Sequence, residues 1–250
     1  MSNVEGIKDK FEGLLEDLKK EFSRSIPNGY RELAATAELP PTAPSYSYSV
    51  FDILSIKGEG EKLAHKLESA EGETPVHRES LTKMGQFIQE NLRGNTLIDL
   101  GAGDQIFVQN LARSFGVKRY IGVDIEGDEI ATKNDSFEKY RLKDDMLLFV
   151  SKLPDNYGSF FIAGAEDYSG GTTQIEYTTG EIGADILPSQ YMEKVLQEVY
   201  RATRPGGLLI VGANNTLLDP ETVGYKFIRF ENTDEETNTI VYIKEMPTKT

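Results

Sequence analysis

Apolar and polar residues follow two different patterns along the chain, and the change between them predicts two kinds of structure. In the first part, apolar residues recur every three or four positions, which is typical of amphipathic helices. One such stripe runs from Val4 to Phe22, and a second runs from Val76 to Leu92 before Gly94. From Thr96 onward, short apolar runs alternate with helical stripes, which is the pattern of an α/β fold.

The alternating part predicts a parallel sheet with helices on both faces. Strands are expected at TLIDL, RYIGVDI, SFEKYRLK, GSFFIAGA and GGLLIVGA, and helices at IFVQNLARSF, MLLFVSKL and PSQYMEKVLQEVYRAT. Strand–helix–strand alternation favours a doubly wound, mostly parallel sheet. The last two strands, YKFIRFEN and NTIVYIKEM, are separated only by a polar turn, so they predict an antiparallel pair at the C-terminal end.

The first 75 residues are predicted to form an N-terminal helical extension and lid on a Rossmann-like domain of residues 76–250. Residues 24–50 contain four prolines and no helical period, so we expect them to be extended or looped. SYSYSVFDIL is expected to be a strand or an aromatic lid segment, and EKLAHKLESA a second short helix. The Val4–Phe22 helix is expected to pack on its own domain, with a partner helix, as in a homodimer, as the alternative.

Composition excludes several classes of function. The chain has 250 residues, a formal net charge of −14, two histidines and no cysteine, which excludes disulfides, thiol nucleophiles and cysteine-based zinc sites. The negative charge argues against a nucleic-acid partner, because no local basic stripe is visible in the sequence. The charged N-terminus and the lack of any long apolar run predict no membrane contact and a cytoplasmic protein.

The residues just after each strand are the candidates for ligand binding, because ligands of open α/β sheets sit at the carboxyl ends of strands. After the first strand come Asp99, Gly101, Ala102 and Gly103, where backbone N–H groups can approach a ligand at the positive end of a helix. After the second comes Asp124, suited to accept two hydrogen bonds from a ribose diol.

Two further strand ends carry polar residues. Asp145 and Met146 follow the third strand and offer a carboxylate acceptor for an exocyclic amine beside a flat apolar contact; Gly164 and Glu166 follow the fourth. Gln105 stands where nucleotide-binding turns carry a third glycine, which disfavours an NAD-type pyrophosphate turn. The 124–145 segment is short for a helix plus a strand, so the helix there is expected to be clipped.

This series resembles the class I S-adenosylmethionine-dependent methyltransferases over residues 77–245. LIDLGAG is similar to their first motif, GVDI to their second-strand acid, DDMLLFVSKLPD to their third-strand segment and RATRPGGLLIVG to the start of their fifth strand. The resemblance implies that S-adenosyl-L-methionine is the cofactor. The cofactor-binding residues that it implies are Asp99, Gly101, Ala102, Gly103 and Gln105, then Asp124 and Ile125, then Asp145 and Met146, and Gly164.

The expected reaction is methyl transfer to a small-molecule acceptor, with a base needed only if the acceptor must lose a proton. The candidate catalytic residues are His77, Glu166, Asp167 and Tyr168. No metal site is predicted, although Glu166 or Asp167 with Asn214 and Asn215 loosely resemble the ligands of metal-dependent catechol-type enzymes. The loop of residues 168–185 is expected to join the lid over the acceptor.

Three other functions are consistent with the same residues. The domain could be a noncatalytic methyltransferase-like scaffold that docks through the Val4–Phe22 helix. It could also methylate a protein, since the acidic balance disfavours only polyanions. An NAD-linked oxidoreductase is the least favoured alternative, because the third glycine is missing.

Overall fold

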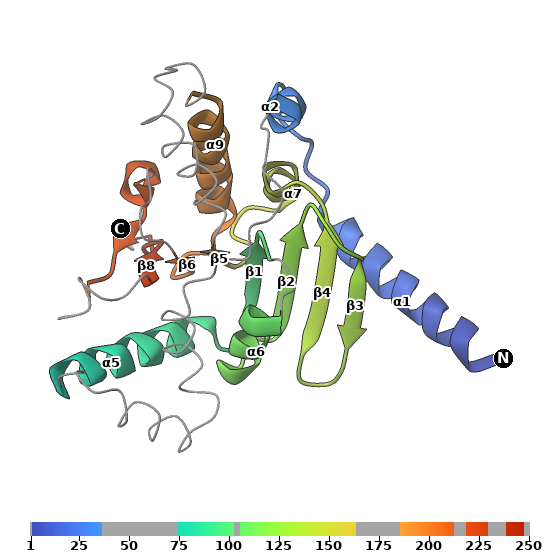
Figure 1. The fold of residues 1–250 in the computed structure, drawn as a ribbon, viewed down its shortest axis with the longest axis horizontal. Coiled ribbons are helices and arrows are strands. Elements are labelled where there is room, and N and C mark those ends of the chain that lie inside the picture. Colours follow the sequence, from blue (N-terminus) through green and yellow to red (C-terminus); the bar gives the residue numbers. More distant parts are fainter. Residues whose placement is uncertain are drawn as a thin grey trace, which may run out of the picture.

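The computed structural model describes residues 2–36, 75–102, 106–163, 186–212, 219–229 and 239–247. The predicted lid segment at residues 45–54, the predicted short helix at residues 61–70 and the loop of residues 168–185 lie outside these ranges. The described residues form an α/β fold around one sheet (Figure 1).

The sheet has eight strands in the order β3-β4-β2-β1-β5-β6-β8-β7. Their bounds are β1 Thr96–Leu100, β2 Arg119–Asp124, β3 Ile130–Lys133, β4 Glu138–Lys143, β5 Ser159–Ala163, β6 Leu208–Gly212, β7 Lys226–Phe227 and β8 Thr239–Ile243. The five central strands β4, β2, β1, β5 and β6 are parallel, whereas β8 pairs antiparallel with β6 and with β7. The predicted fold class, with its antiparallel C-terminal pair, is confirmed.

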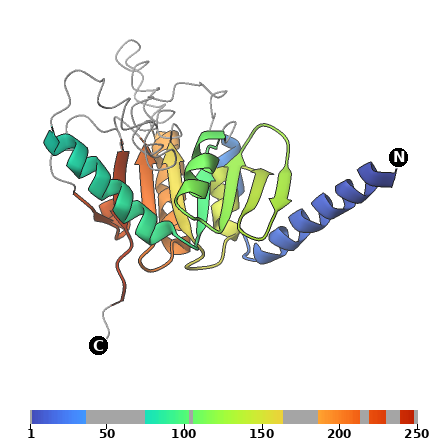
Figure 2. The ribbon, with the colours of Figure 1, turned by 90° about the horizontal axis from the view of Figure 1, so that it is seen from below.

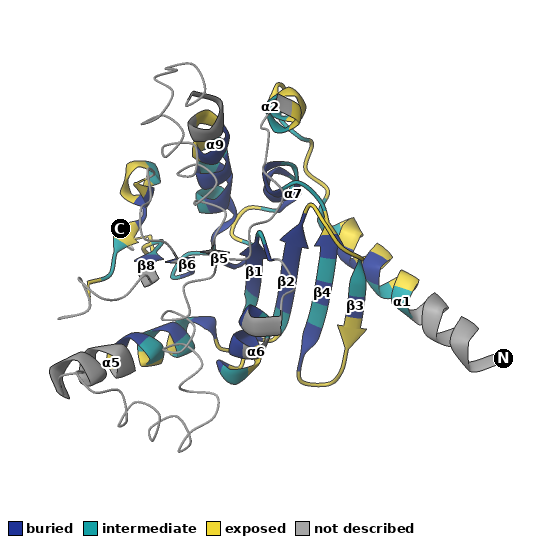
Figure 3. Cartoon of the chain, viewed as in Figure 1, coloured by how far each residue is buried: buried dark blue, intermediate teal, exposed yellow. Residues whose placement is uncertain are grey.

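Helices cover both faces of this sheet. Their bounds are α1 Ser2–Glu21, α2 Tyr30–Thr36, α5 Pro75–Leu92, α6 Ile106–Ser114, α7 Met146–Lys152, α9 Ile186–Ala202 and the 3-10 helix η1 Pro220–Val223. Figure 1 shows α7 and α9 on one side of the central strands and α5 and α6 on the other. Leu97 and Ile98, neighbours on β1, are fully buried in the two separate cores. Burial on both sides explains why the sequences of β1, β5 and β6 are mostly apolar (Figure 3).

The second half of α1 packs on its own domain, as expected. Leu15 and Leu18 are buried in the core that contains α7 and α9, and the ring of Phe22 meets Phe149 edge-on at 5.2 Å between centroids. Lys19 also forms an ion pair of 3.0 Å with Glu129, next to β3. The homodimer and the domain boundary near residue 75 stay predictions.

Two local predictions were wrong. Residues 30–36 form helix α2 instead of an extended loop, and the Tyr30 hydroxyl donates to a carboxylate oxygen of Glu198 on α9 at 3.2 Å. Between β2 and β4 the chain forms strand β3, antiparallel to β4, where a clipped helix was expected. The hairpin turn is fixed by Asn134, whose side-chain oxygen accepts the N–H groups of Ser136 and Phe137, so a helical turn is not needed to reverse the chain.

Candidate cofactor site

The strand ends named from the sequence lie side by side in the sheet. β1 pairs with β2 and β2 with β4, and the register places Asp99 opposite Gly122 and Asp124 opposite Lys143. Asp145 follows β4 directly. Three of the predicted carboxylates therefore gather at the carboxyl ends of three adjacent parallel strands, beside the point where the strand order reverses between β1 and β5.

The glycine turn after β1 is fastened to β2. Gly101 has a φ of +74°, in the left-handed region that glycine adopts without strain, and Ala102 is buried. The N–H groups of Gly101 and Ala102 both donate to the carbonyl oxygen of Val123, at 3.0 Å each. These two amides hold the turn, so any ligand contact through their N–H groups stays a prediction.

Asp99 is the most deeply buried acid at these strand ends, with 2% of its surface exposed. The Tyr120 hydroxyl, on β2, donates to Asp99 Oδ2 at 2.6 Å. Burial raises the pKa of Asp99 to about 7, the negative charge of Asp124 acts in the same direction, and the Tyr120 hydrogen bond opposes both. A carboxyl that can gain or lose its proton near neutral pH thus lies under the glycine turn.

Asp124 and Ile125 form the next part of the site. Asp124 is 5% exposed, and its Oδ1 accepts the N–H of Glu126 at 2.9 Å, which turns the chain sharply after β2. Ile125 is 36% exposed; in the described part of the chain, the other exposed large apolar residue is Met246. Ile125 thus offers an exposed apolar side chain next to a buried carboxylate.

Asp145 is the N-cap of α7. Its Oδ1 accepts the N–H of Leu148 at 2.9 Å, and its Oδ2 accepts the hydroxyl of Tyr191, on α9, at 2.7 Å. Burial raises the pKa of Asp145, while the hydrogen bonds from Leu148 and Tyr191 act against that rise. Met146, the next residue, is buried. The carboxylate expected to accept an exocyclic amine is therefore also the N-cap of a helix.

The remaining predicted site residues are not brought into this cluster by the described structure. His77 lies in the first turn of α5. The others lie outside the described residues: Gly103, Gln105, Gly164, Glu166, Asp167 and Tyr168. Among the residues that are described, no group of three or more acidic or histidine side chains comes together to hold a metal ion.

Sequence reasoning missed both tyrosines. Tyr120 lies on the same face of the sheet as Asp99, and the strand register that brings the two together is not given by the sequence. Tyr191 lies 46 residues after Asp145, on a helix whose rotation no local pattern fixes.

A basic row follows β4 on the face shared with α6. Strand alternation places Lys139, Arg141 and Lys143 on this face, and in Figure 2 no described helix lies in front of β3 and β4. Burial, Arg113 and Arg141 lower the pKa of Lys139. The sequence showed no basic stripe because the basic residues alternate with others that face the opposite core.

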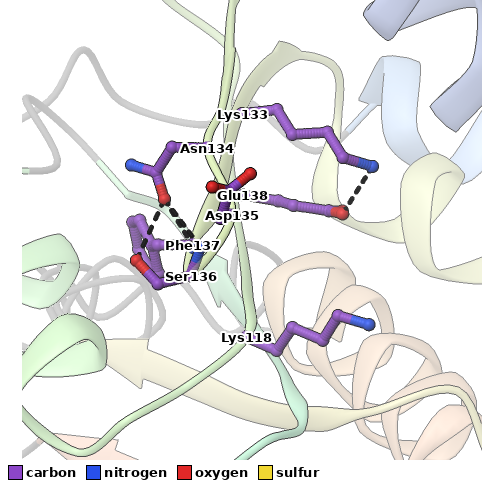
Figure 4. Close-up of a pocket in the computed structure, with 7 residues that line it drawn as sticks. All are labelled: Lys118, Lys133, Asn134, Asp135, Ser136, Phe137 and Glu138. Carbon is purple, nitrogen blue, oxygen red and sulfur yellow. Dashed lines mark hydrogen bonds and ion pairs between the residues drawn. The ribbon is translucent and has the colours of Figure 1, made fainter.

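A hollow of about 320 Å³ lies at the other end of the same strands (Figure 4). It is lined by Lys118 and by the hairpin residues 133–138. Its polar groups largely satisfy one another, since Lys133 pairs with Glu138 at 2.7 Å and the Asn134 oxygen accepts from Ser136 and Phe137. Because this hollow is at the amino ends of β2 and β4, it lies away from the candidate cofactor site at their carboxyl ends.

None of the described helices is long and apolar enough to cross a membrane. No family model matches the chain, and no curated protein matches it either.

The chain is similar to several solved structures at low sequence identity. The antibiotic-resistance methyltransferase Kmr is 16% identical, with 65% of this chain and 92% of that chain covered and a TM-score of 0.40. The N-methyltransferase NodS from Bradyrhizobium japonicum WM9 is 12% identical, with 69% and 98% covered and a TM-score of 0.42. The complex of the Haloferax volcanii Trm112 methyltransferase activator with a methyltransferase gives 14% identity, 78% and 100% coverage and a TM-score of 0.41.

Proposed function

We propose that the chain is an S-adenosyl-L-methionine-dependent methyltransferase that acts on a small molecule. The observation that carries the proposal is the gathering of Asp99, Asp124 and Asp145 at three adjacent strand ends, together with the exposed Ile125. These groups fit a ligand with a cationic end, a sugar diol and a flat ring with an exocyclic amine. The cofactor supplies an electrophilic methyl group when it is bound.

The described residues have distinct tasks in this proposal. Asp99 would face the cationic end, Asp124 would accept the sugar hydroxyls, and Asp145 with Ile125 would hold the ring. The turn after β1 brings little side-chain bulk to the site, because it contains glycine. Its backbone is held in place by the hydrogen bonds from Gly101 and Ala102 to β2. Positioning of this kind contributes much of the acceleration of an in-line displacement. His77, Glu166, Asp167 and Tyr168 remain proposed as the groups that would accept a proton from the acceptor.

A small neutral or cationic acceptor is favoured by the net charge of −14. The basic row of Lys139, Arg141 and Lys143 is the described feature that would favour an anionic acceptor instead. It lies on β4, beside the proposed ring-binding side of the site. We therefore propose a small molecule as the acceptor. A nucleic-acid acceptor is an outcome that the activity assay can reveal. A cytoplasmic location stays an expectation.

A noncatalytic scaffold is the second candidate. The feature in its favour is the replacement of the β2–β4 helix by the β3 hairpin, which leaves the adjoining sheet face without a described helix. A scaffold of this kind would not need to bind the cofactor. A protein acceptor remains the third, since it would use the same cofactor site.

Calorimetric titration with S-adenosylhomocysteine tests the cofactor site. We expect micromolar or tighter binding by the wild type. Asp124→Ala should weaken it by at least about 100-fold, because two hydrogen bonds to a charged group are lost. Asp124→Asn, which keeps the acceptor for Glu126, separates loss of binding from loss of folding. Asp135→Ala, an exposed carboxylate in the β3–β4 turn, is the matched control and should bind like the wild type.

Absence of binding by the folded wild type would overturn the proposal and leave the scaffold. If binding is found, transfer of a labelled methyl group to a metabolite extract, a protein extract or total RNA identifies the acceptor class.

A further inference from the structure

The pair of Asp99 and Asp124 is electrostatically unusual for a site without a described cation between them. Both carboxyl groups are buried, both belong to the α6 face of the sheet, and they sit on adjacent strands. Two like charges at such a place cannot both ionise cheaply, because burial already disfavours the charged forms. The neighbouring carboxylate therefore adds to the tendency of Asp99 to hold a proton.

The described surroundings select Asp99 as the carboxyl that holds the proton. The described ionisable groups around it are Tyr120 and Asp124 on β2, while its register partner on β5 is Phe161. Lys143 of β4 lies beside Asp124 and not beside Asp99. Burial raises the pKa of Asp99 to about 7, and the charge of the neighbouring Asp124 acts in the same direction.

Tyr120 is placed to control this proton. The residue has no exposed surface, and its hydroxyl points at Asp99 Oδ2 from 2.6 Å. A hydroxyl that donates to a carboxylate stabilises the ionised form, so this contact keeps the pKa of Asp99 from rising further. The tyrosine does not reach the strand end itself, since it stands four residues before Asp124, so it acts through Asp99.

We propose that Tyr120 is a positioning residue that makes cofactor binding proton-coupled: Asp99 releases its proton to solvent as the cationic ligand arrives, while Tyr120 continues to donate to the carboxylate. No bond other than the Asp99 O–H breaks, and the positive charge of the ligand replaces that of the proton. The proposal rests on the proposed function, and it adds a second ligand, the proton, that competes with the cofactor.

The test is the pH dependence of S-adenosylhomocysteine affinity between pH 5.5 and 7.5. In this window an α-amino group, with a pKa of about 8, stays mostly protonated, so the ligand contributes little to the change. For the wild type we expect the affinity to fall towards tenfold per pH unit below a midpoint near the pKa of Asp99. Titrations in two buffers of different ionisation heat should show release of up to about one proton per bound ligand at the acid end.

Tyr120→Phe keeps the ring and removes only the hydroxyl. Its midpoint should move to higher pH, so that at pH 7 it binds about threefold to tenfold more weakly than the wild type, with the difference shrinking as the pH rises. Comparison of the two proteins cancels any titration of the ligand. Tyr140→Phe, a buried tyrosine of the opposite core, is the matched control and should keep the wild-type profile.

Asp99→Asn cannot titrate at this position, so its affinity, whatever its size, should not follow the wild-type profile. The proposal is overturned if wild-type affinity does not change across the window, if Tyr120→Phe leaves the midpoint in place, or if Asp99→Asn retains the wild-type midpoint. Binding that is present but independent of pH removes this proposal and leaves the proposed function intact. No binding at any pH removes both.

Discussion

The site contains two tyrosine–aspartate pairs that look alike but are built differently. Tyr120 donates to Asp99 at 2.6 Å, and Tyr191 donates to Asp145 at 2.7 Å. Asp99 is buried and Asp145 is partly buried, and burial raises the pKa of each. The pairs differ in what else surrounds the carboxylate.

Asp145 has a second donor, the N–H of Leu148, and stands at the N-terminus of α7, where a negative charge is favoured. For Asp99 the structure describes one donor, Tyr120, and a carboxylate neighbour, Asp124, that disfavours its charge. The same hydroxyl contact therefore acts on a carboxyl group with a second donor after β4, and on a carboxyl group beside a like charge in β1. Burial is the largest cause of the raised pKa in both acids, and the two differ in how deeply they are buried and in the donors and charges beside them.

The largest expected effect concerns Asp99→Asn and the pH dependence of stability. In the folded protein the pKa of Asp99 is raised to about 7, whereas the ordinary pKa of an aspartate is 3.8. A raised acid pKa means that the folded state holds more protons than the unfolded state, so the wild type loses stability as the pH rises through this interval. Because one pKa unit is worth about 1.4 kcal/mol, the stability of Asp99→Asn relative to the wild type should rise by about 4 kcal/mol from pH 4 to pH 8.

Urea unfolding of both proteins at several pH values measures this difference, and all other titrating groups are shared. Tyr140→Phe, compared in the same way, should show a constant difference. A constant difference for Asp99→Asn as well would mean that Asp99 is already ionised in the folded protein at low pH, and the contrast between the two pairs would be lost.

Asp145→Ala is expected to cost about 3 kcal/mol of unfolding free energy. The substitution removes the N-cap of α7, worth about 1 kcal/mol, and leaves the buried Tyr191 hydroxyl without its acceptor, at a cost of about 2 kcal/mol. Asp145→Asn is the matched control, because asparagine caps helices as well as aspartate and keeps an oxygen acceptor. A similar loss in both variants would show that the charge, and not the hydrogen-bond geometry, is what the fold requires.

Most strands of the sheet could be predicted from the sequence because each one is marked by a local run of apolar residues. TLIDL and GGLLIVG are mostly apolar since both faces of β1 and β6 are covered. Gly94 follows α5 with a φ of +72°, where a larger residue would be strained. The β3 hairpin could not be predicted. Its residues carry mixed polar and apolar character, and only pairing with β4 decides between strand and helix.

The candidate site could be predicted only in part. The acids at strand ends were found because their position follows from the strand boundaries. The groups that set the charge of those acids were not found, because Tyr120 and Tyr191 reach them across strands and from a distant helix. Pairwise contacts of this kind depend on register and helix rotation, which are properties of the packed structure.

Tyr191→Phe is the smallest expected change and the sharpest comparison with Tyr120→Phe. Asp145 would keep the Leu148 N–H and the N-terminus of α7, so we expect a loss of about 1 kcal/mol in unfolding free energy. S-adenosylhomocysteine should bind about twofold to fivefold more weakly, by the same factor at pH 6.5 and pH 7.5. The factor should not depend on pH because the Leu148 N–H and the N-terminus of α7 still stabilise the ionised form of Asp145, while its side chain is held less rigidly. If Tyr191→Phe instead moved the pH midpoint as far as Tyr120→Phe does, the second donor would not protect Asp145. The two pairs would then be one kind of site.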